Sequence, residues 1–278
     1  MVKLVKVIKM IFSLCFVVFF ISCSSNQNDA DNKLLFGGEG YQSISFFGTF
    51  EDETKVYIGK TITKPNLINE SITYIDLYYY DQEMKFIKSI QISLGYGLKS
   101  FIFADVIDEK IFLFFNSEGN SIMSSESLGG SDPLIMVVNK NGEVVDLKRY
   151  GGSGKDEFLD VRINNNKEWI ILGSSDSNDG DFNNNFDDKS YFVLKVNLQL
   201  NIVDEVYYDN STSYELLRIN SKNQVYLFGR IWDGTTYTFN GSNRRNLDVL
   251  IVKLDENFKE MIYGDPIMNW KLIRERDG

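Results

Sequence analysis

The residues best suited to chemistry in this sequence are the oxygen-bearing side chains of the stretch "DGDFNNNFD". Alternating oxygen donors can curl a loop around a hard cation such as Ca²⁺, with a backbone carbonyl contributing at the seventh position. Asn184 stands where such loops usually have glycine, and no other segment repeats the pattern, so a solvated Asn/Asp turn is the simpler alternative. The predicted calcium ligands are Asp179, Asp181, Asn183, Asn185 and Asp187.

A second candidate is the glycine-rich stretch "RYGGSGKDEF", which could be a phosphate-binding loop. A Walker loop needs a glycine five residues before its Gly-Lys pair and a Ser or Thr after it, and here those places hold Arg149 and Asp156. A dinucleotide-binding loop must open a helix, whereas the following "EFLDVRI" is typical of a strand. The stretch is therefore interpreted as a turn between two structural units.

The sequence contains no histidine. Its absence excludes Ser-His and Cys-His nucleophilic catalysis and the usual zinc sites. The 39 acidic residues are the remaining acid-base groups, and no spacing among them singles out a catalytic pair. The sequence therefore predicts that the protein is not an enzyme and has no certain cofactor, with calcium as the one candidate.

The N-terminus has the organisation of an export signal. Three lysines precede an apolar run over residues 10–21, which is too short to span a bilayer as a helix. The small Ser22 before Cys23 resembles a bacterial lipoprotein signal, although Phe20 stands where leucine is usual. We expect a signal peptide at 1–22, lipid on Cys23 and a flexible tether over 23–32; an ordinary cleaved signal or a weak anchor is the alternative.

The charge of the chain limits the classes of partner that it can bind. Removal of residues 1–22 takes away three of the 29 basic residues and none of the 39 acidic ones, so the formal charge changes from -10 to 26 - 39 = -13. Such an acidic surface repels nucleic acid backbones and anionic lipid headgroups. The sequence predicts no nucleic acid partner, and a membrane attachment that depends on the lipid at Cys23.

Four segments repeat at a constant spacing. They are "IDLYYYDQEMK" from Ile75, "PLIMVVNKNGE" from Pro133, "YFVLKVNLQLN" from Tyr191 and "VLIVKLDENFK" from Val249, each 58 residues after the last. Each is an apolar run followed by an Asp or Asn and a polar turn, as expected of a buried strand entering a hairpin. The residues at this turn position are Asp81, Asn139, Asn197 and Asp255.

Each unit has room for about four strands, and strong helix signals are absent. A repeat of this length with four strands is typical of a β-propeller. We therefore predict a single all-β domain over residues 33–278, a β-propeller of four or five four-stranded blades. A large β-sandwich or an open solenoid of sheets is the alternative.

The strings "GGSDPLIMVVNKNGEVVDLKRYGGSGKDEF" and "GSSDSNDGDFNNNFDDKSYFVLKVNLQLNIVDEVYYDN" are similar to the Gly-Gly-Ser-Gly-Asp propeller repeats of secreted and envelope proteins in diderm bacteria. The similarity covers nearly the whole chain after the signal. The Trp common before the corner is missing, and two corners lack glycines. The resemblance implies a propeller fold and an extracytoplasmic location, and it implies no catalytic residue.

The connection after the second strand of each unit is expected to be long, and the one over residues 230–247 is unusual in composition. That segment is rich in aromatic and arginine side chains, which dominate protein-binding hot spots. Inward packing of the aromatic side chains is the alternative. The predicted function is a lipid-anchored, non-enzymatic binding module for an envelope or extracellular protein, exported to the bacterial membrane. The alternative is a periplasmic scaffold for outer-membrane protein assembly. The predicted partner-binding residues are Arg230, Trp232, Tyr237, Phe239, Arg244 and Arg245.

Overall fold

The computed structural model describes residues 41–63, 71–96, 99–118, 128–182, 189–208, 212–239, 242–255, 258 and 260–264. All of them belong to one compact unit, Glu39–Gly278. The predicted signal peptide, the tether and the lipidation residue Cys23 lie outside the described residues.

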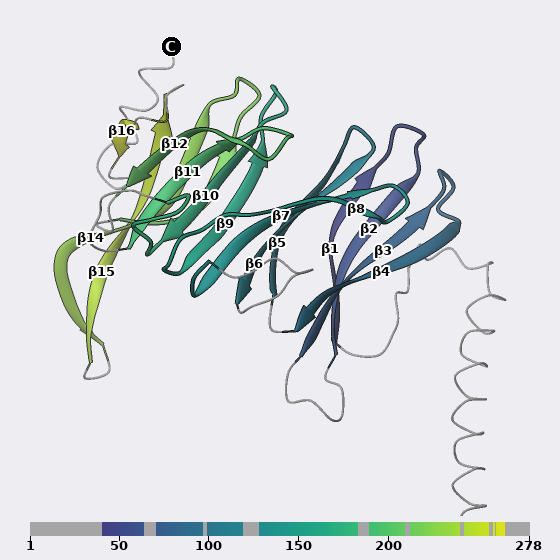
Figure 1. Cartoon of the computed structure of the whole chain (residues 1–278). Helices are drawn as coiled ribbons and strands as arrows, with labels where there is room; N and C mark the ends of the chain where they lie inside the picture. The colour runs from purple at the N-terminus through teal and green to yellow at the C-terminus, as the bar shows by residue number, and fades with distance from the viewer. Residues whose placement is uncertain are drawn as a thin grey trace, which may run out of the picture. The chain divides into compact units, whose positions relative to one another are not determined.

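Sixteen strands form four separate four-stranded antiparallel sheets, each in sequence order (Figure 1). The first sheet holds β1 (Tyr41–Thr49), β2 (Lys55–Thr63), β3 (Ile72–Tyr80) and β4 (Phe86–Tyr96). The second holds β5 (Lys99–Ile107), β6 (Lys110–Glu118), β7 (Ser131–Asn139) and β8 (Val144–Arg149). The third holds β9 (Asp156–Ile163), β10 (Trp169–Ser175), β11 (Ser190–Val196) and β12 (Ile202–Tyr208). The fourth holds β13 (Thr212–Ile219), β14 (Val225–Phe239), β15 (Ser242–Leu254) and β16 (Glu260–Gly264).

The predicted hairpin turns after the third strands are confirmed. The Asn139 side chain accepts hydrogen bonds from the backbone amides of Asn141 at 2.9 Å and Glu143 at 3.0 Å. Asn197 binds the amides two and four residues further on in the same way, and Asp81 binds the amide of Lys85. These side chains close the turn that leads each chain segment into the outer strand of its sheet.

Alternate residues of an inner strand face opposite sides of its sheet, as the pleat requires. In β7, Leu134, Met136 and Val138 pack in a core shared with the first sheet, while Ile135 and Val137 pack in a core shared with the third. A further core joins the third and fourth sheets. The second and third sheets are thus covered on both faces, which explains their near-continuous apolar strands.

The first strands of the sheets also contact one another in order: β1 meets β5, β5 meets β9 and β9 meets β13. The predicted all-β class with four-stranded units is therefore confirmed over the described residues. The four sheets are separate and do not form one closed barrel.

A β-bulge recurs where each outer strand begins. In each sheet the third strand pairs with the outer strand, and the register shifts between the last two paired residues of that third strand. The third strands are β3, β7, β11 and β15. The extra residue is Ile87 in β4, Val145 in β8 and Val203 in β12, again 58 residues apart, and each is about half exposed. None of these residues belongs to the three cores, so Val145 and Val203 serve below as matched surface controls.

Among the described residues, no helix is long and apolar enough to cross a membrane.

Candidate functional site

The glycine-rich corner, residues 151–155, connects β8 of the second sheet to β9 of the third. Its backbone passes very close to the turn that follows β10. A Cβ at Gly152 would overlap the Asp179 carboxylate and the Ser177 side chain, so only glycine fits there. The sequence of the corner is therefore explained by a close approach between two backbone segments.

The amides of this corner are already bound by the chain itself. Ser153 N donates to Asp179 Oδ1 at 2.6 Å, and Gly154 N donates to Ser177 Oγ at 2.8 Å. Gly151 N donates to Asp181 Oδ2 at 3.2 Å. A phosphate would need these same donors. The corner thus holds the chain's own carboxylates, in agreement with its interpretation as a turn.

Asp156 is the buried centre of the corner. Its carboxylate accepts hydrogen bonds from Gly152 N at 2.8 Å, Ser175 Oγ at 2.5 Å and Ser177 Oγ at 2.9 Å. Burial raises the pKa of the Asp156 carboxyl above its ordinary value, and the nearby charge of Asp132 acts in the same direction. These three donors act in the opposite direction on the pKa, because they stabilise the ionised form.

A second buried carboxylate lies beside the first. Asp132, at the start of β7, is fully buried and accepts from Arg149 Nη1 at 2.8 Å and from Leu128 N at 2.9 Å. The Arg149 side chain is itself almost fully buried. A buried carboxylate that loses its partner is strongly destabilising, so this pair fixes the end of β8 against the start of β7.

Only part of the predicted calcium loop can be placed. Asp179 and Asp181 direct one carboxylate oxygen each at the amides of the corner. Asn183, Asn185 and Asp187 lie outside the described residues. Over the described part of the chain, no group of three or more His, Cys, Asp or Glu residues is arranged to bind a metal ion. Calcium binding at this loop stays a prediction.

The predicted long loop over residues 230–247 is wrong. Strands β14 and β15 continue through it as a paired ribbon, and only residues 240 and 241 separate them. The pairing runs from Trp232 with Leu247 to Phe239 with Ser242. The expectation failed because two polar and aromatic segments joined by a short "NG" link satisfy each other's backbone groups.

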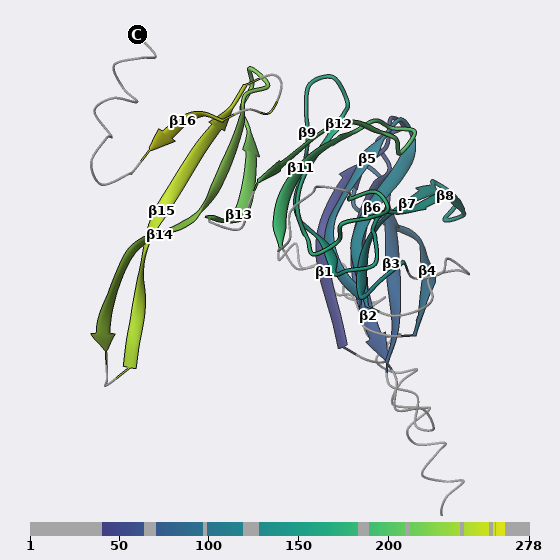
Figure 2. The ribbon, with the colours of Figure 1, turned by 60° about the vertical axis from the view of Figure 1, so that its left-hand side comes forward.

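The ribbon extends past the rest of its sheet (Figure 2). Among the described residues, β13 pairs with β14 as far as Ile231, and beyond that residue the described pairing is between β14 and β15. Tyr237 and Arg244 are register partners within this extension, and Thr236 pairs with Arg245. The ribbon therefore brings an aromatic position and two arginine positions together from both strands.

The predicted partner-binding residues are all on β14 or β15. Arg230 precedes the extension, and its exposed side chain pairs with Glu215 of β13 at 3.0 Å. The backbone positions of the other five lie in the extension, whereas their side chains are outside the described part of the structure. Their role in binding stays a prediction.

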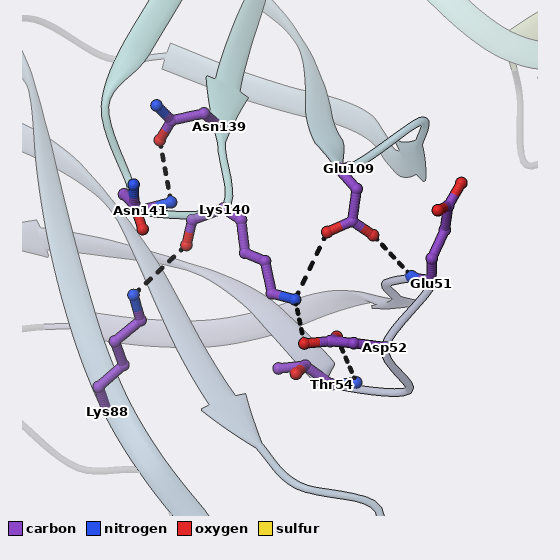
Figure 3. Close-up of polar contacts among 8 residues, drawn as sticks. All are labelled: Glu51, Asp52, Thr54, Lys88, Glu109, Asn139, Lys140 and Asn141. Atoms are coloured by element: carbon purple, nitrogen blue, oxygen red, sulfur yellow. Dashed lines mark hydrogen bonds and ion pairs between the residues drawn. The ribbon is translucent and has the colours of Figure 1, made fainter.

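A cluster that the sequence did not reveal joins the turns of the first two sheets (Figure 3). Lys140 Nζ contacts the carboxylate of Asp52 and lies 3.4 Å from Glu109 Oε2. Glu109 in turn accepts a hydrogen bond from Glu51 N at 2.7 Å. Lys140 also lies 5.0 Å above the ring of Phe50. No sequence signal pairs these residues, because they come from three separate turns.

Comparable contacts join the later sheets. Lys167 of the β9–β10 turn pairs with Asp108 at 2.6 Å, and Asn165 N donates to Asn223 of the β13–β14 turn at 2.8 Å. Asp160 of β9 accepts from Leu217 N at 2.9 Å, which ties β9 to β13. These polar contacts therefore join successive sheets outside the ribbon.

No family model and no curated protein matches the chain. Similar solved structures include a cobalt-substituted apocarotenoid oxygenase from Synechocystis, at 15% identity and a TM-score of 0.40, covering 81% of this chain and 49% of that one. A protein of unknown function from Bacteroides caccae matches at 9% identity and a TM-score of 0.32, covering 75% of this chain and 73% of that one. The chain spans about half the length of the oxygenase.

These comparisons contradict the prediction that the protein is not an enzyme, because the oxygenase is an enzyme. That prediction is therefore withdrawn. A likeness at this TM-score transfers no reaction, substrate or metal to the present chain.

Proposed function

We propose that this chain is a lipid-anchored protein-interaction module of the bacterial cell envelope, whose sheets are blades of a β-propeller-type array. Two features of the fold support the propeller arrangement. Each sheet is a four-stranded meander, and the first strands contact one another in order. Successive sheets also pack face to face through three cores, as propeller blades do.

The observation that carries the interaction function is the ribbon at the end of β14 and β15. A two-stranded hairpin is marginally stable in water unless it packs against something else. Here it continues for several residues beyond β13 and contains Trp232, Tyr237 and Arg244. Aromatic residues and arginines bury large areas at low entropic cost in protein interfaces. A partner protein in the envelope that covers the ribbon would supply the missing packing.

The location rests on the N-terminal sequence. Cys23 follows an export signal, and the nine residues after it are polar. Lipid on Cys23 would place the sheets next to a membrane, within reach of other envelope proteins.

The test is capture of crosslinked partners from intact cells by the full-length protein. We expect Trp232→Ala, and separately a paired Arg244→Ala and Arg245→Ala change, to reduce capture of the main partner at least about tenfold, as for hot-spot residues. Lys222→Ala is the matched control, because it removes one positive charge from the exposed turn at the opposite end of β14.

Thermal unfolding separates binding from folding. Loss of capture with an unchanged Tm supports the proposal. If Trp232→Ala unfolds the protein while the double arginine variant captures normally, the ribbon belongs to the core and the proposal is wrong.

A further inference from the structure

Each sheet after the first uses one face to pack on the sheet before it. In the second sheet this face includes Ala104 and its register partner Leu113, which pack in the core shared with the first sheet. The matching register pairs are Val161 with Ile171 in the third sheet and Leu217 with Leu227 in the fourth. All of these side chains are buried. We call this the preceding face of a sheet.

The preceding face of the first sheet has no earlier sheet among the described strands. The register pair at the same place is Phe47 with Tyr57, and Phe47 is 52% exposed. The other side of this sheet, with Val56 and Ile58, packs on the second sheet. The first sheet thus presents to solvent the kind of face that is buried in the other three.

This face carries an aromatic row that crosses all four strands, with Phe47 and Phe86 exposed at its two ends and Tyr80 only 6% exposed between them. Ring centroids are 4.9 Å apart for Phe47 and Tyr57, 5.5 Å for Tyr57 and Tyr80, and 5.7 Å for Tyr80 and Phe86. Phe86 is 54% exposed, whereas its equivalents Val144 and Ile202 pack against inter-sheet cores. We define the aromatic face by Phe47, Tyr57, Tyr80 and Phe86.

The fourth sheet ends the series with the opposite kind of face. Phe228 is the register partner of both Leu216 and Ile251. In the earlier sheets the residues equivalent to Phe228, namely Ile58, Phe114 and Leu172, are buried against the following sheet. Here Phe228 and Ile251 are only partly buried and Leu216 is 45% exposed. We define the apolar end face by Leu216, Phe228 and Ile251.

At each interface within the chain, one sheet packs on the preceding face of the next sheet. Two faces are left over, the preceding face of the first sheet and the opposite face of the fourth sheet. Because Phe47, Phe86 and Leu216 are exposed, these two faces do not cover each other within one chain. We propose that the aromatic face of one copy binds the apolar end face of a second copy, so that sheets stack between chains as they do within a chain.

The residue types of the aromatic face fit an interface that opens and closes. Tyr57 and Tyr80 stand where the later sheets have the aliphatic residues Leu113 and Val138. Tyrosine combines a large apolar ring with a hydroxyl that water can bind, so it is suited both to contact and to solvent. A permanently buried face would be expected to keep the aliphatic residues of the other sheets.

The geometry makes the contact heterologous, because the two faces are different surfaces. Every copy carries one of each, so association can continue beyond a dimer. A chain with only one working face can still pair once with a chain that keeps the other. This property distinguishes the proposal from an ordinary two-fold dimer.

The experiment is sedimentation velocity of the full chain in detergent. We expect the wild type to form species larger than one chain, in a concentration-dependent manner. A double Phe47→Ser, Phe86→Ser variant, and separately Leu216→Ser, should each sediment as a single chain. Val145→Ser and Val203→Ser are the matched controls, because these bulge residues are each 50% exposed and lie on β8 and β12, in sheets that carry neither face. Both controls should associate like the wild type.

The decisive sample mixes the two face variants. Each retains the face that the other lacks, so a mixture should contain dimers that neither variant forms alone. Thermal unfolding verifies folding, and Leu216→Thr replaces Leu216→Ser if the latter unfolds. A single-chain wild type, equal loss of association in the bulge controls, or a mixture without dimers would overturn the proposal. None of these outcomes bears on the ribbon, which is tested by partner capture.

Discussion

At the scale of single residues, Asp156 and Asp179 show how burial decides the importance of similar contacts. Both carboxylates accept hydrogen bonds from amides of the same glycine-rich corner. Asp179 is exposed, so water can replace it, whereas Asp156 is fully buried beneath Ser175 and Ser177. A buried donor that loses its acceptor keeps the full cost of desolvation.

We therefore predict that Asp156→Ala lowers the free energy of unfolding by about 2–4 kcal/mol, since one amide and two hydroxyls lose their acceptor. Asp179→Ala should cost less than about 1 kcal/mol. Urea unfolding in the presence of EDTA measures both, with any metal at the Asp/Asn loop removed. Equal losses in the two variants would mean that Asp156 is not the anchor of the corner.

Lys140 and Asp52 give a prediction about pH. The hydrogen bond from Lys140 lowers the pKa of the Asp52 carboxyl to about 2. An unfolded aspartate titrates near about 3.9, so the stabilisation from this group is present above that pH and is lost as the pH falls toward 2. We expect Lys140→Met to raise the pKa of Asp52 toward the ordinary range, while the hydrogen bonds from Thr54 still lower it, as followed by carbon NMR of the carboxyl group.

Lys167→Met is the control for that titration, because it removes an exposed ion pair with Asp108 between the second and third sheets. It should leave the pKa of Asp52 unchanged. If Asp52 titrates at the same pH in the wild type and in Lys140→Met, the contact of Figure 3 does not persist in solution.

At the scale of elements, Gly173 shows that strand packing restricts individual positions. A Cβ there would overlap the ring of Phe192 and approach Glu157 O to 2.5 Å. We predict that Gly173→Ala destabilises the protein by about 1–3 kcal/mol through overpacking. Gly130→Ala is the control, since the nearest atom to its Cβ would be Gly154 O at 3.5 Å. Thermal unfolding compares the two, and equal Tm values would show that β10 shifts to accept the methyl group.

Many of the strands and turns could be predicted from the sequence. The 58-residue spacing located the third strands, and the turn residues Asp81, Asn139 and Asn197 bind the backbone as expected. The turn signal is local, since a side-chain turn depends on neighbours along the chain, and the 58-residue spacing is the recurrence of such local patterns. The glycine-rich corner was also interpreted correctly as a turn, because its failed motifs excluded a nucleotide loop.

The remaining features depend on residues far apart in the chain. Asp160 and Leu217 are 57 residues apart and Asp132 and Arg149 are 17 apart, and no local pattern pairs them. The ribbon was missed for a related reason. Its strands lack the apolar alternation of a half-buried sheet, so their pairing became visible only in the register of β14 with β15.

At the scale of the whole molecule, stability comes from a series of sheet-to-sheet contacts. The three cores are consecutive, and each joins only neighbouring sheets. Repeat proteins built in this way usually have atypical end units. The tyrosines of the first sheet and the extended hairpin of the fourth are such departures. The proposed surfaces, namely the ribbon and the two end faces, are therefore all in the first and fourth sheets.

Membrane attachment is the last property of the whole chain to be tested. Without residues 1–22 the protein has a formal charge of 26 - 39 = -13, so we expect anionic headgroups to repel its surface and predict that attachment depends on lipid at Cys23. We predict that the wild type stays with the membrane fraction in high salt and incorporates labelled palmitate, whereas Cys23→Ser loses the label and appears in the soluble fraction. Ser24→Ala is the control and should behave like the wild type. Release of the wild type by salt alone, or retention of unlabelled Cys23→Ser on membranes, would show that the protein surface and not a lipid makes the attachment.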